Sequence, residues 1–169
     1  MIPTVLFVAR SETGKTTLIE GVIGRLASMG YRVGALKHAG HPVKMDTDGT
    51  DSWRFSEAGS DVTIVTSPSG IMLTRRWQEE MPLEGIIAEF GRDLDILLVE
   101  GYKGTSFPKI EVFRSETGAD LLCRGEQNDP ALVALAADIP LDEDVPVFSI
   151  DDHGSIARFL VERFLKKQD

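Results

Sequence analysis

A short loop between an apolar run and an amphipathic segment constrains the fold more than any other feature of the chain. The loop spans residues 9–17, with the sequence ARSETGKTT, and it follows the run IPTVLFV at residues 2–8. This run is short, uncharged and rich in β-branched and aromatic residues, which predicts a buried strand. After Lys15, apolar residues recur at helical spacing as far as Gly30, which predicts a helix and its end. A strand, a tight loop with Gly-Lys-Thr and a helix are the context expected of a phosphate-binding P-loop.

The chemistry expected of this loop follows from its backbone. Successive N–H groups, from Glu12 through the first helical turn, would point inward and bind phosphate oxygens. Lys15 would neutralise the outer phosphates, and the Thr16 hydroxyl would ligate Mg²⁺. The usual pattern opens with glycine where this chain has Ala9, and it has a small residue where this chain has Glu12. We therefore expect weaker binding than glycines at both places would allow. The alternative is a sharp strand-to-helix turn that carries Gly-Lys-Thr by coincidence.

Length, charge and cysteine content narrow the class of protein. The chain of 169 residues predicts a single domain over residues 1–169, and no apolar run is long enough to cross a bilayer. The first ten residues lack the features of a signal peptide, so they are interpreted as strand. The net charge is −9, from 18 basic and 27 acidic residues, which argues against nucleic-acid binding and leaves a protein as the expected large partner. The single cysteine, Cys123, excludes an internal disulfide and fits the cytoplasm.

The rest of the chain alternates strand-like and helix-like segments, with one interruption. A strand at residues 31–36 completes a βαβ unit, which is parallel and right-handed. Two strand-like runs flank Ser-Pro-Ser-Gly at residues 67–70 and predict a hairpin at a sheet edge or as a projecting ribbon. The fold class expected is therefore α/β: a three-layer, P-loop NTPase-like, mostly parallel sheet with helices on both faces and an added β-hairpin. The further expected segments are strands at 61–66, 71–75, 95–100, 109–113 (half-exposed, because its residues alternate), 131–136 and 145–150, and helices at 51–58, 84–90 and 153–167.

Two acidic positions are candidates for the magnesium side of the site. Glu100 ends the apolar run DILLVE, and the carboxyl ends of parallel strands share the edge at which ligands bind. An acid in this position faces Mg²⁺ and the outer phosphate in P-loop folds, so Lys15 and Glu100 are the candidate catalytic residues. The alternative for Glu100 is a solvated strand end. Asp46 could supply a further carboxylate to the metal through water, although an Asx-turn explains it nearly as well.

Base recognition and the remaining polar residues are less constrained. Asp138 follows the strand-like run ALVALA, where a carboxylate could accept the N1–H and N2–H₂ donors of guanine; a turn cap explains it equally well. The Asn-Lys-x-Asp motif of many GTPases is absent. His38 and His41 provide too few ligands for zinc, so we expect them to face phosphate, a partner or solvent. Lys103 and Arg114 could contact a bound anion, but both are interpreted as surface residues.

Taken together, these segments resemble the molybdopterin-guanine dinucleotide biosynthesis protein B (MobB) family. The resemblance covers nearly the whole chain and rests on ARSETGKTT, on KHAGHPVKMDTDGTDSWRFSEAGS at residues 37–60, on LLVEGYKG from Leu97 and on PKIEVFR from Pro108. It implies binding of GTP with Mg²⁺, low GTPase activity, a homodimer, and association with the guanylyltransferase that joins GMP to molybdopterin. It also implies phosphate contacts by Thr13, Gly14, Lys15, Thr16 and Thr17.

The resulting expectation is a cytoplasmic GTP-binding adapter that is at most a slow GTPase, since neither an arginine finger in cis nor a water-orienting glutamine is evident. The residues alone do not distinguish GTP from ATP. One alternative is a small-molecule kinase or ATP-dependent ligase of the dethiobiotin synthetase kind, because that fold also joins a P-loop to a Val-Glu-Gly strand end. Another is a scaffold with a degenerate P-loop. The hairpin around residues 67–70 is expected to mediate dimerisation, because strand edges pair readily.

Overall fold

The chain divides into two compact units, each of which is built from its own elements. The computed structural model describes residues 2–11, 13–118, 120–125 and 128–166. The first unit comprises Met1–His38 and Leu83–Asp169, and the second comprises Ala39–Pro82. Whether these two units form the single domain expected over residues 1–169 is not tested by this division, so the single domain stays a prediction.

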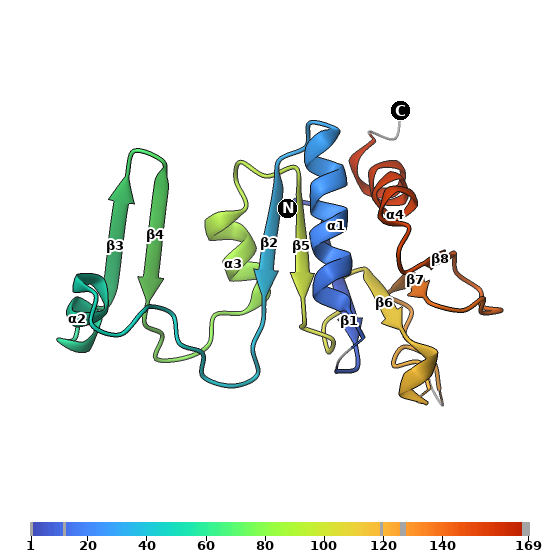
Figure 1. The fold of residues 1–169 in the computed structure, drawn as a ribbon, viewed down its shortest axis with the longest axis horizontal. Coiled ribbons are helices and arrows are strands. Elements are labelled where there is room, and N and C mark those ends of the chain that lie inside the picture. The colour runs from blue at the N-terminus through green and yellow to red at the C-terminus, as the bar shows by residue number, and fades with distance from the viewer. Residues whose placement is uncertain (1, 12, 119, 126–127, 167–169) are drawn as a thin grey trace. The chain divides into compact units, whose positions relative to one another are not determined.

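The first unit is organised around a six-stranded sheet with the order β2-β5-β1-β6-β7-β8, in which every neighbouring pair is parallel (Figure 1). The central position of β1 places the loop that follows it between the carboxyl ends of β5 and β6. The strands are β1 (Thr4–Ala9), β2 (Val33–Lys37), β5 (Ile96–Glu100), β6 (Lys109–Phe113), β7 (Leu132–Ala137) and β8 (Val147–Ser149).

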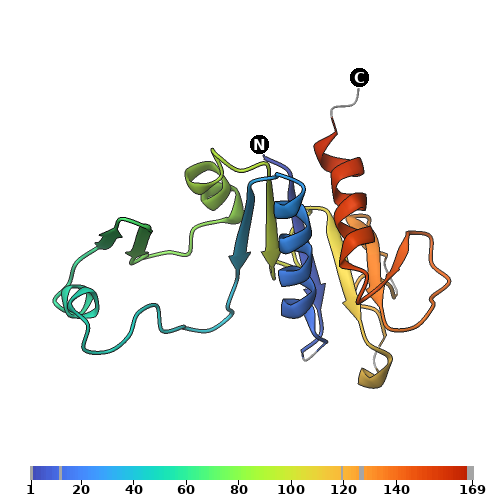
Figure 2. The same ribbon diagram turned by 45° about the horizontal axis from the view of Figure 1, so that its top comes forward.

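Helices cover both faces of this sheet. The helices are α1 (Lys15–Ser28), α3 (Leu83–Phe90) and α4 (His153–Leu160), with a 3₁₀ turn at Ser115–Thr117 and a final helical turn at Val161–Leu165. Side chains alternate across β1, so Val5 and Phe7 pack with α1 and α4, whereas Leu6 and Val8 pack with α3. Figure 2 shows α1 and α4 on the same side of the sheet. The expected three-layer α/β fold is therefore confirmed. Within the described residues, no helix is both long and apolar enough to cross a bilayer.

Strand β6 differs from the half-exposed strand that the alternation in its sequence predicted. It lies inside the sheet between β1 and β7, and Lys109 and Glu111 are each only 2% exposed. Their polar atoms are satisfied by a later part of the chain. Lys109 Nζ donates to a carboxylate oxygen of Asp129 at 2.6 Å, and the Glu111 carboxylate accepts the N–H groups of Leu122 and Cys123 at 2.5 and 2.9 Å. The prediction of a half-exposed strand was wrong because buried charged residues that are paired or hydrogen-bonded give the same alternating sequence as a strand with one face in solvent.

The second unit contains a short helix and the predicted hairpin. Helix α2 (Asp51–Glu57) is capped by the Thr50 side chain, which accepts the Trp53 N–H at 3.2 Å. Strands β3 (Val62–Ser67) and β4 (Gly70–Arg75) form a separate antiparallel sheet, so the added hairpin is confirmed. One face of the hairpin contacts α2 through the Ser56 and Thr63 hydroxyls, 3.0 Å apart. The apolar side chains of the other face are exposed, and they are Val62, Ile64, Ile71 and Leu73.

Candidate functional site

The loop between β1 and α1 ends on a glycine in the left-handed backbone conformation. Gly14 precedes the first residue of α1 and has φ +81°, a conformation that favours glycine. Thr13 is buried, and its hydroxyl donates to the Arg10 carbonyl at 3.3 Å. The amino end of α1 therefore points its N–H groups and positive dipole end at the carboxyl edge of the sheet. Glu12, which was also predicted to bind phosphate, lies outside the described residues.

Glu100 lies at the centre of a charged cluster beside this loop. In the sheet, Glu100 pairs with Phe7 of β1, and the Glu100 side chain is 17% exposed. One carboxylate oxygen accepts the Thr16 hydroxyl at 3.4 Å, and the other lies 3.5 Å from both Lys15 Nζ and Lys37 Nζ. The structure thus brings together Lys15, Thr16 and Glu100, as the sequence predicted, and it adds Lys37 from the end of β2.

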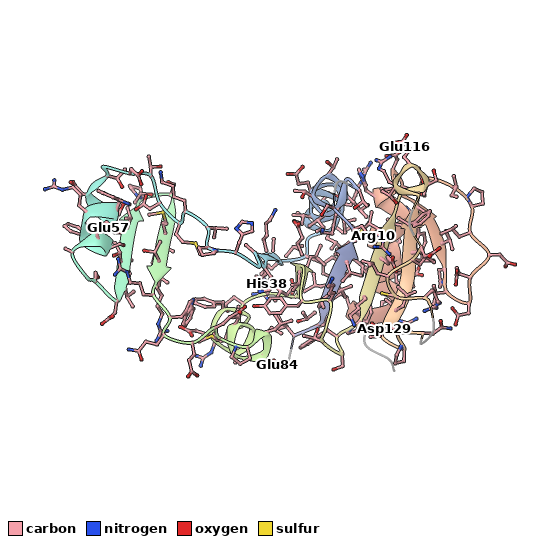
Figure 3. All side chains as sticks on the ribbon, turned by 90° about the horizontal axis from the view of Figure 1, so that it is seen from below. Arg10, His38, Glu57, Glu84, Glu116 and Asp129 are labelled. Carbon is pink, nitrogen blue, oxygen red and sulfur yellow. The ribbon has the colours of Figure 1, made fainter. Side chains whose placement is uncertain are left out.

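The chain immediately after Glu100 makes a close approach to the end of β2. Gly101 has φ +111°, and a Cβ at this position would lie 2.9 Å from the Cβ of His38. The rings of His38 and Tyr102 stack with centroids 4.2 Å apart, and Tyr102 itself has φ 52°. Figure 3 looks onto this edge from below and labels Arg10, His38 and Glu116, which follow β1, β2 and β6. Among the residues that the structure describes, no group of three or more His, Cys, Asp or Glu side chains is arranged for a metal ion.

Arg114 was set aside by sequence reasoning, but the structure places it against the loop. It was interpreted as a surface residue, but it is half-buried and its Nε donates to the Thr13 carbonyl at 3.0 Å. Its Nη2 lies 3.3 Å from the place that a Cβ on Gly14 would occupy. Arg114 directly follows β6, the neighbour of β1, so the strand order was the signal that could have revealed the contact.

Asp138 follows β7 at the same edge and is held by the residue after Arg114. Its carboxylate accepts the Ser115 N–H and the Ser115 hydroxyl, both at 2.9 Å. The hydrogen bond from the Ser115 backbone is the main reason why the pKa of Asp138 lies below its ordinary value. A cavity of about 400 Å³ borders Asp138 and is lined by residues 137–141 and 147–149. The role of Asp138 in reading guanine stays a prediction.

Asp46 belongs to the second unit, where it forms a turn ahead of α2. Its Oδ1 accepts the Thr47 N–H at 2.7 Å and the Thr50 hydroxyl at 3.4 Å. Hydrogen bonding, first from Ser52 and then from Thr47, lowers the pKa of Asp46. The backbone N–H that Asp46 accepts is one residue on, whereas an Asx-turn uses the N–H two residues on. The predicted contact of Asp46 with Mg²⁺ stays a prediction.

Known proteins similar to this chain belong to one family. The family model described as Molybdopterin guanine dinucleotide synthesis protein B (MobB) matches residues 4–138. The chain is 37% identical to the molybdopterin-guanine dinucleotide biosynthesis adapter protein of Escherichia coli K12, covering 100% of this chain and 97% of that protein. It is 33% identical to the adapter protein of the same name from Haemophilus influenzae, covering 94% of this chain and 88% of that protein.

Solved structures agree with this result. The crystal structure of Bacillus subtilis MobB is 29% identical, has a TM-score of 0.74, and is covered over 100% of its length by 99% of this chain. A crystal structure of molybdopterin-guanine biosynthesis protein B has a TM-score of 0.76 at 24% identity, covering 96% of this chain and 99% of that chain, and it supports the fold. Because the family model spans most of the sequence and the relatives match nearly end to end, the chain belongs to the MobB family.

Proposed function

We propose that the chain is a GTP-binding adapter in molybdopterin guanine dinucleotide biosynthesis, which holds GTP and Mg²⁺ in the loop after β1 and assists the guanylyltransferase. Two of its sequence relatives are named as adapter proteins of this pathway. The single observation that carries nucleotide binding is the Gly14 turn at the amino end of α1, with Lys15 and Thr16 both directed at Glu100. That combination supplies amide donors, a mobile ammonium group and oxygen ligands within one edge of the sheet.

The residues present fit a magnesium nucleotide. A Cβ at position 14 would lie 3.3 Å from the Arg114 side chain, so glycine keeps the turn at the start of α1 open. The Thr16 hydroxyl and the Glu100 carboxylate are hard oxygen ligands, 3.4 Å apart, of the kind that Mg²⁺ prefers. When bound, Mg²⁺ neutralises charge on the phosphate oxygens. Lys15, which pairs with Glu100 at 3.5 Å, would then be available to the outer phosphates.

The proposal includes weak intrinsic GTPase activity and assigns the chain an adapter role rather than a metabolic reaction. Thr13 to Thr17 would contact phosphate, with Thr16 and Glu100 at the metal and Asp138 at the base. A calorimetric titration of GTP and ATP, each with and without Mg²⁺, tests this directly. We expect Mg²⁺-dependent binding that favours GTP, and binding of neither nucleotide would overturn the proposal. Rapid turnover of ATP that depends on a small-molecule acceptor would instead identify a kinase or ligase.

Replacing Glu100 with glutamine is expected to separate nucleotide binding from metal binding. The carboxylate repels phosphate and holds Lys15 and Lys37, so Glu100→Gln should strengthen GTP binding in the absence of Mg²⁺. The neutral amide is a poorer ligand, and the gain in GTP affinity on adding Mg²⁺ should fall by about tenfold, which corresponds to about 1.4 kcal/mol. Calorimetry with and without Mg²⁺ measures both effects. Glu84→Gln, which makes the same change on α3, should alter neither, and an unchanged Mg²⁺ gain in Glu100→Gln would contradict the assigned role.

The homodimer is proposed to form through the exposed face of the β3–β4 hairpin. Ile64 and Ile71 lie on the face opposite α2, where they are 54% and 68% exposed. An exposed apolar patch of this kind marks an interaction surface, and two copies of the same patch are self-complementary. Ile71→Lys should therefore weaken self-association by at least about tenfold, measured as the dimer dissociation constant by analytical ultracentrifugation. Ser69→Lys, at the turn of the same hairpin, adds the same charge and should leave the dissociation constant unchanged. A wild-type monomer, or an Ile71→Lys dimer as stable as wild type, would contradict this interface.

A further inference from the structure

The segment that follows β6 contacts both ends of the candidate nucleotide site. Arg114 donates to Thr13 of the loop, and the adjacent Ser115 donates to Asp138. We propose that this segment couples phosphate binding to base recognition, with Arg114 as the positioning residue for the loop. The inference rests on the proposed function, because it concerns the same bound nucleotide.

On the phosphate side, Arg114 fixes the direction of one peptide group. Its Nε donates to the Thr13 carbonyl at 3.0 Å. Because a trans peptide is planar, its carbonyl and the next N–H point in opposite directions. The bond to Arg114 therefore aims the Gly14 N–H away from the guanidinium. Gly14 has φ +81°, which is the left-handed conformation found in anion-binding turns of successive N–H groups. The guanidinium holds this peptide in place and adds a positive charge beside it.

On the base side, Ser115 fixes the carboxylate that would read guanine. Asp138 accepts two hydrogen bonds from Ser115, one on each oxygen, and each carboxylate oxygen has a second lone pair. Those lone pairs can accept the two neighbouring donors of guanine, whereas adenine presents an acceptor at N1. The cavity next to Asp138 has apolar walls that include Ile139 and Phe148, which suit the faces of a flat ring. The hydrogen bonds from Ser115, and the nearby charge of Arg114, lower the pKa of Asp138 and keep it ionised at neutral pH.

The two contacts are linked because they come from consecutive residues on a fixed strand end. In β6, Val112 pairs with Ala9 of β1, and Phe113 pairs with Ala137 of β7. Arg114 and Ser115 leave this strand between the loop and Asp138, so neither contact can shift without moving the other. An altered loop should therefore change how well the site discriminates between bases, and not its affinity for phosphate alone.

The experiment compares GTP with inorganic triphosphate, which has the phosphates and no base. Calorimetry with Mg²⁺ gives a dissociation constant for each, and their ratio is the contribution of the base. Arg114→Ala should weaken triphosphate binding by about tenfold, since it removes a charged hydrogen bond, and should also lower the base contribution several-fold. Asp138→Asn should lower the base contribution and leave triphosphate binding unchanged. In the double variant the two losses of base contribution should not add, because they pass through one segment.

Three further variants make the outcome decisive. Arg92→Ala removes the same charge from the segment between α3 and β5 and should change neither constant. Arg114→Lys keeps the charge without the planar fork, so it should restore triphosphate binding more than the base contribution. Ser115→Ala removes one of the two hydrogen bonds to Asp138 and should lower the base contribution. If Arg114→Ala does not fold, Arg114→Lys tests the coupling: a base contribution equal to that of wild type, with triphosphate binding weakened, would overturn it.

Equal weakening of GTP and triphosphate by Arg114→Ala would show that Arg114 acts on phosphate alone and would overturn the coupling. Unchanged binding of both ligands would overturn it as well. A wild-type chain that binds neither ligand would instead overturn the proposed function, and the coupling with it.

Discussion

Replacing Lys15 with alanine is expected to weaken GTP binding by about 100-fold, which corresponds to about 2.7 kcal/mol. Lys15 is the first residue of α1, and its side chain is 18% exposed. In the proposed complex, an ammonium group in this position would make charge-assisted hydrogen bonds to the outer phosphates. The loss should be smaller for GMP than for GTP, because the missing group contacts the outer phosphates. Calorimetric dissociation constants for both nucleotides measure the effect.

The fold should survive this change, which makes the result interpretable. Lys15 and Lys37 both lie 3.5 Å from the same oxygen of Glu100, so Lys15→Ala leaves the carboxylate with one cationic partner. Thermal denaturation of the nucleotide-free variant should therefore follow that of wild type closely. Lys166→Ala, at the exposed end of the chain, is the matched loss of charge and should leave GTP binding unchanged. Equal affinity of Lys15→Ala and wild type for GTP would indicate a scaffold with a degenerate loop.

The second large effect concerns stability and arises at Lys109. Lys109→Met should lower the free energy of unfolding by about 3 kcal/mol, because breaking a buried ion pair leaves the partner charge uncompensated. The Lys109 side chain is 3% exposed, and its ammonium group donates to Asp129 at 2.6 Å and to the Thr105 carbonyl at 2.5 Å. Methionine fills a similar volume but offers no donor to either oxygen. Urea unfolding followed by circular dichroism measures the change.

An exposed pair provides the control. Lys166 and Glu162 lie 3.9 Å apart with both side chains largely exposed, so Lys166→Met should cost less than about 0.5 kcal/mol.

Burial raises the pKa of Asp129, but the stronger combined effect of the Lys109 hydrogen bond and its other partners leaves the pKa lowered. This contribution to stability is present above the ordinary carboxyl pKa of about 3.9 and is lost as the pH falls through the lower folded value. A loss below about 1 kcal/mol in Lys109→Met at neutral pH would contradict the importance of the buried pair.

The parts of the fold that were predictable are those whose signals are local. The loop at residues 9–17 is flanked by its own strand and helix, and the hairpin is marked by its turn, so both were identified from short stretches of sequence. The position of Glu100 at the carboxyl edge was predictable because it ends an apolar, strand-like run, and its contact with Mg²⁺ stays a prediction. Each of these predictions needed only the period of the side chains and the residues at a turn.

The features that were missed depend on partners distant in the sequence. Lys109 and Glu111 resemble the solvent face of a strand until the segment that contains Leu122, Cys123 and Asp129 is seen to cover them. Arg114 contacts Thr13, which lies 101 positions earlier, and no local sequence pattern predicts that contact. Strand order decides both cases, and a sequence with parallel strands is compatible with several orders.

The shared contact at Glu100 has a consequence for the resting protein in the cell. Its carboxylate serves as an internal counter-ion for two lysines, so this edge of the sheet presents less net positive charge to anions. If Lys15 and Lys37 turned from Glu100 to bind inorganic phosphate, the negative charge of Glu100 would lose its partners, and inorganic phosphate brings no divalent cation to replace them. A polyphosphate that arrives with its metal satisfies both requirements at once. If the proposed function holds, the site should bind inorganic phosphate weakly and a magnesium polyphosphate more tightly.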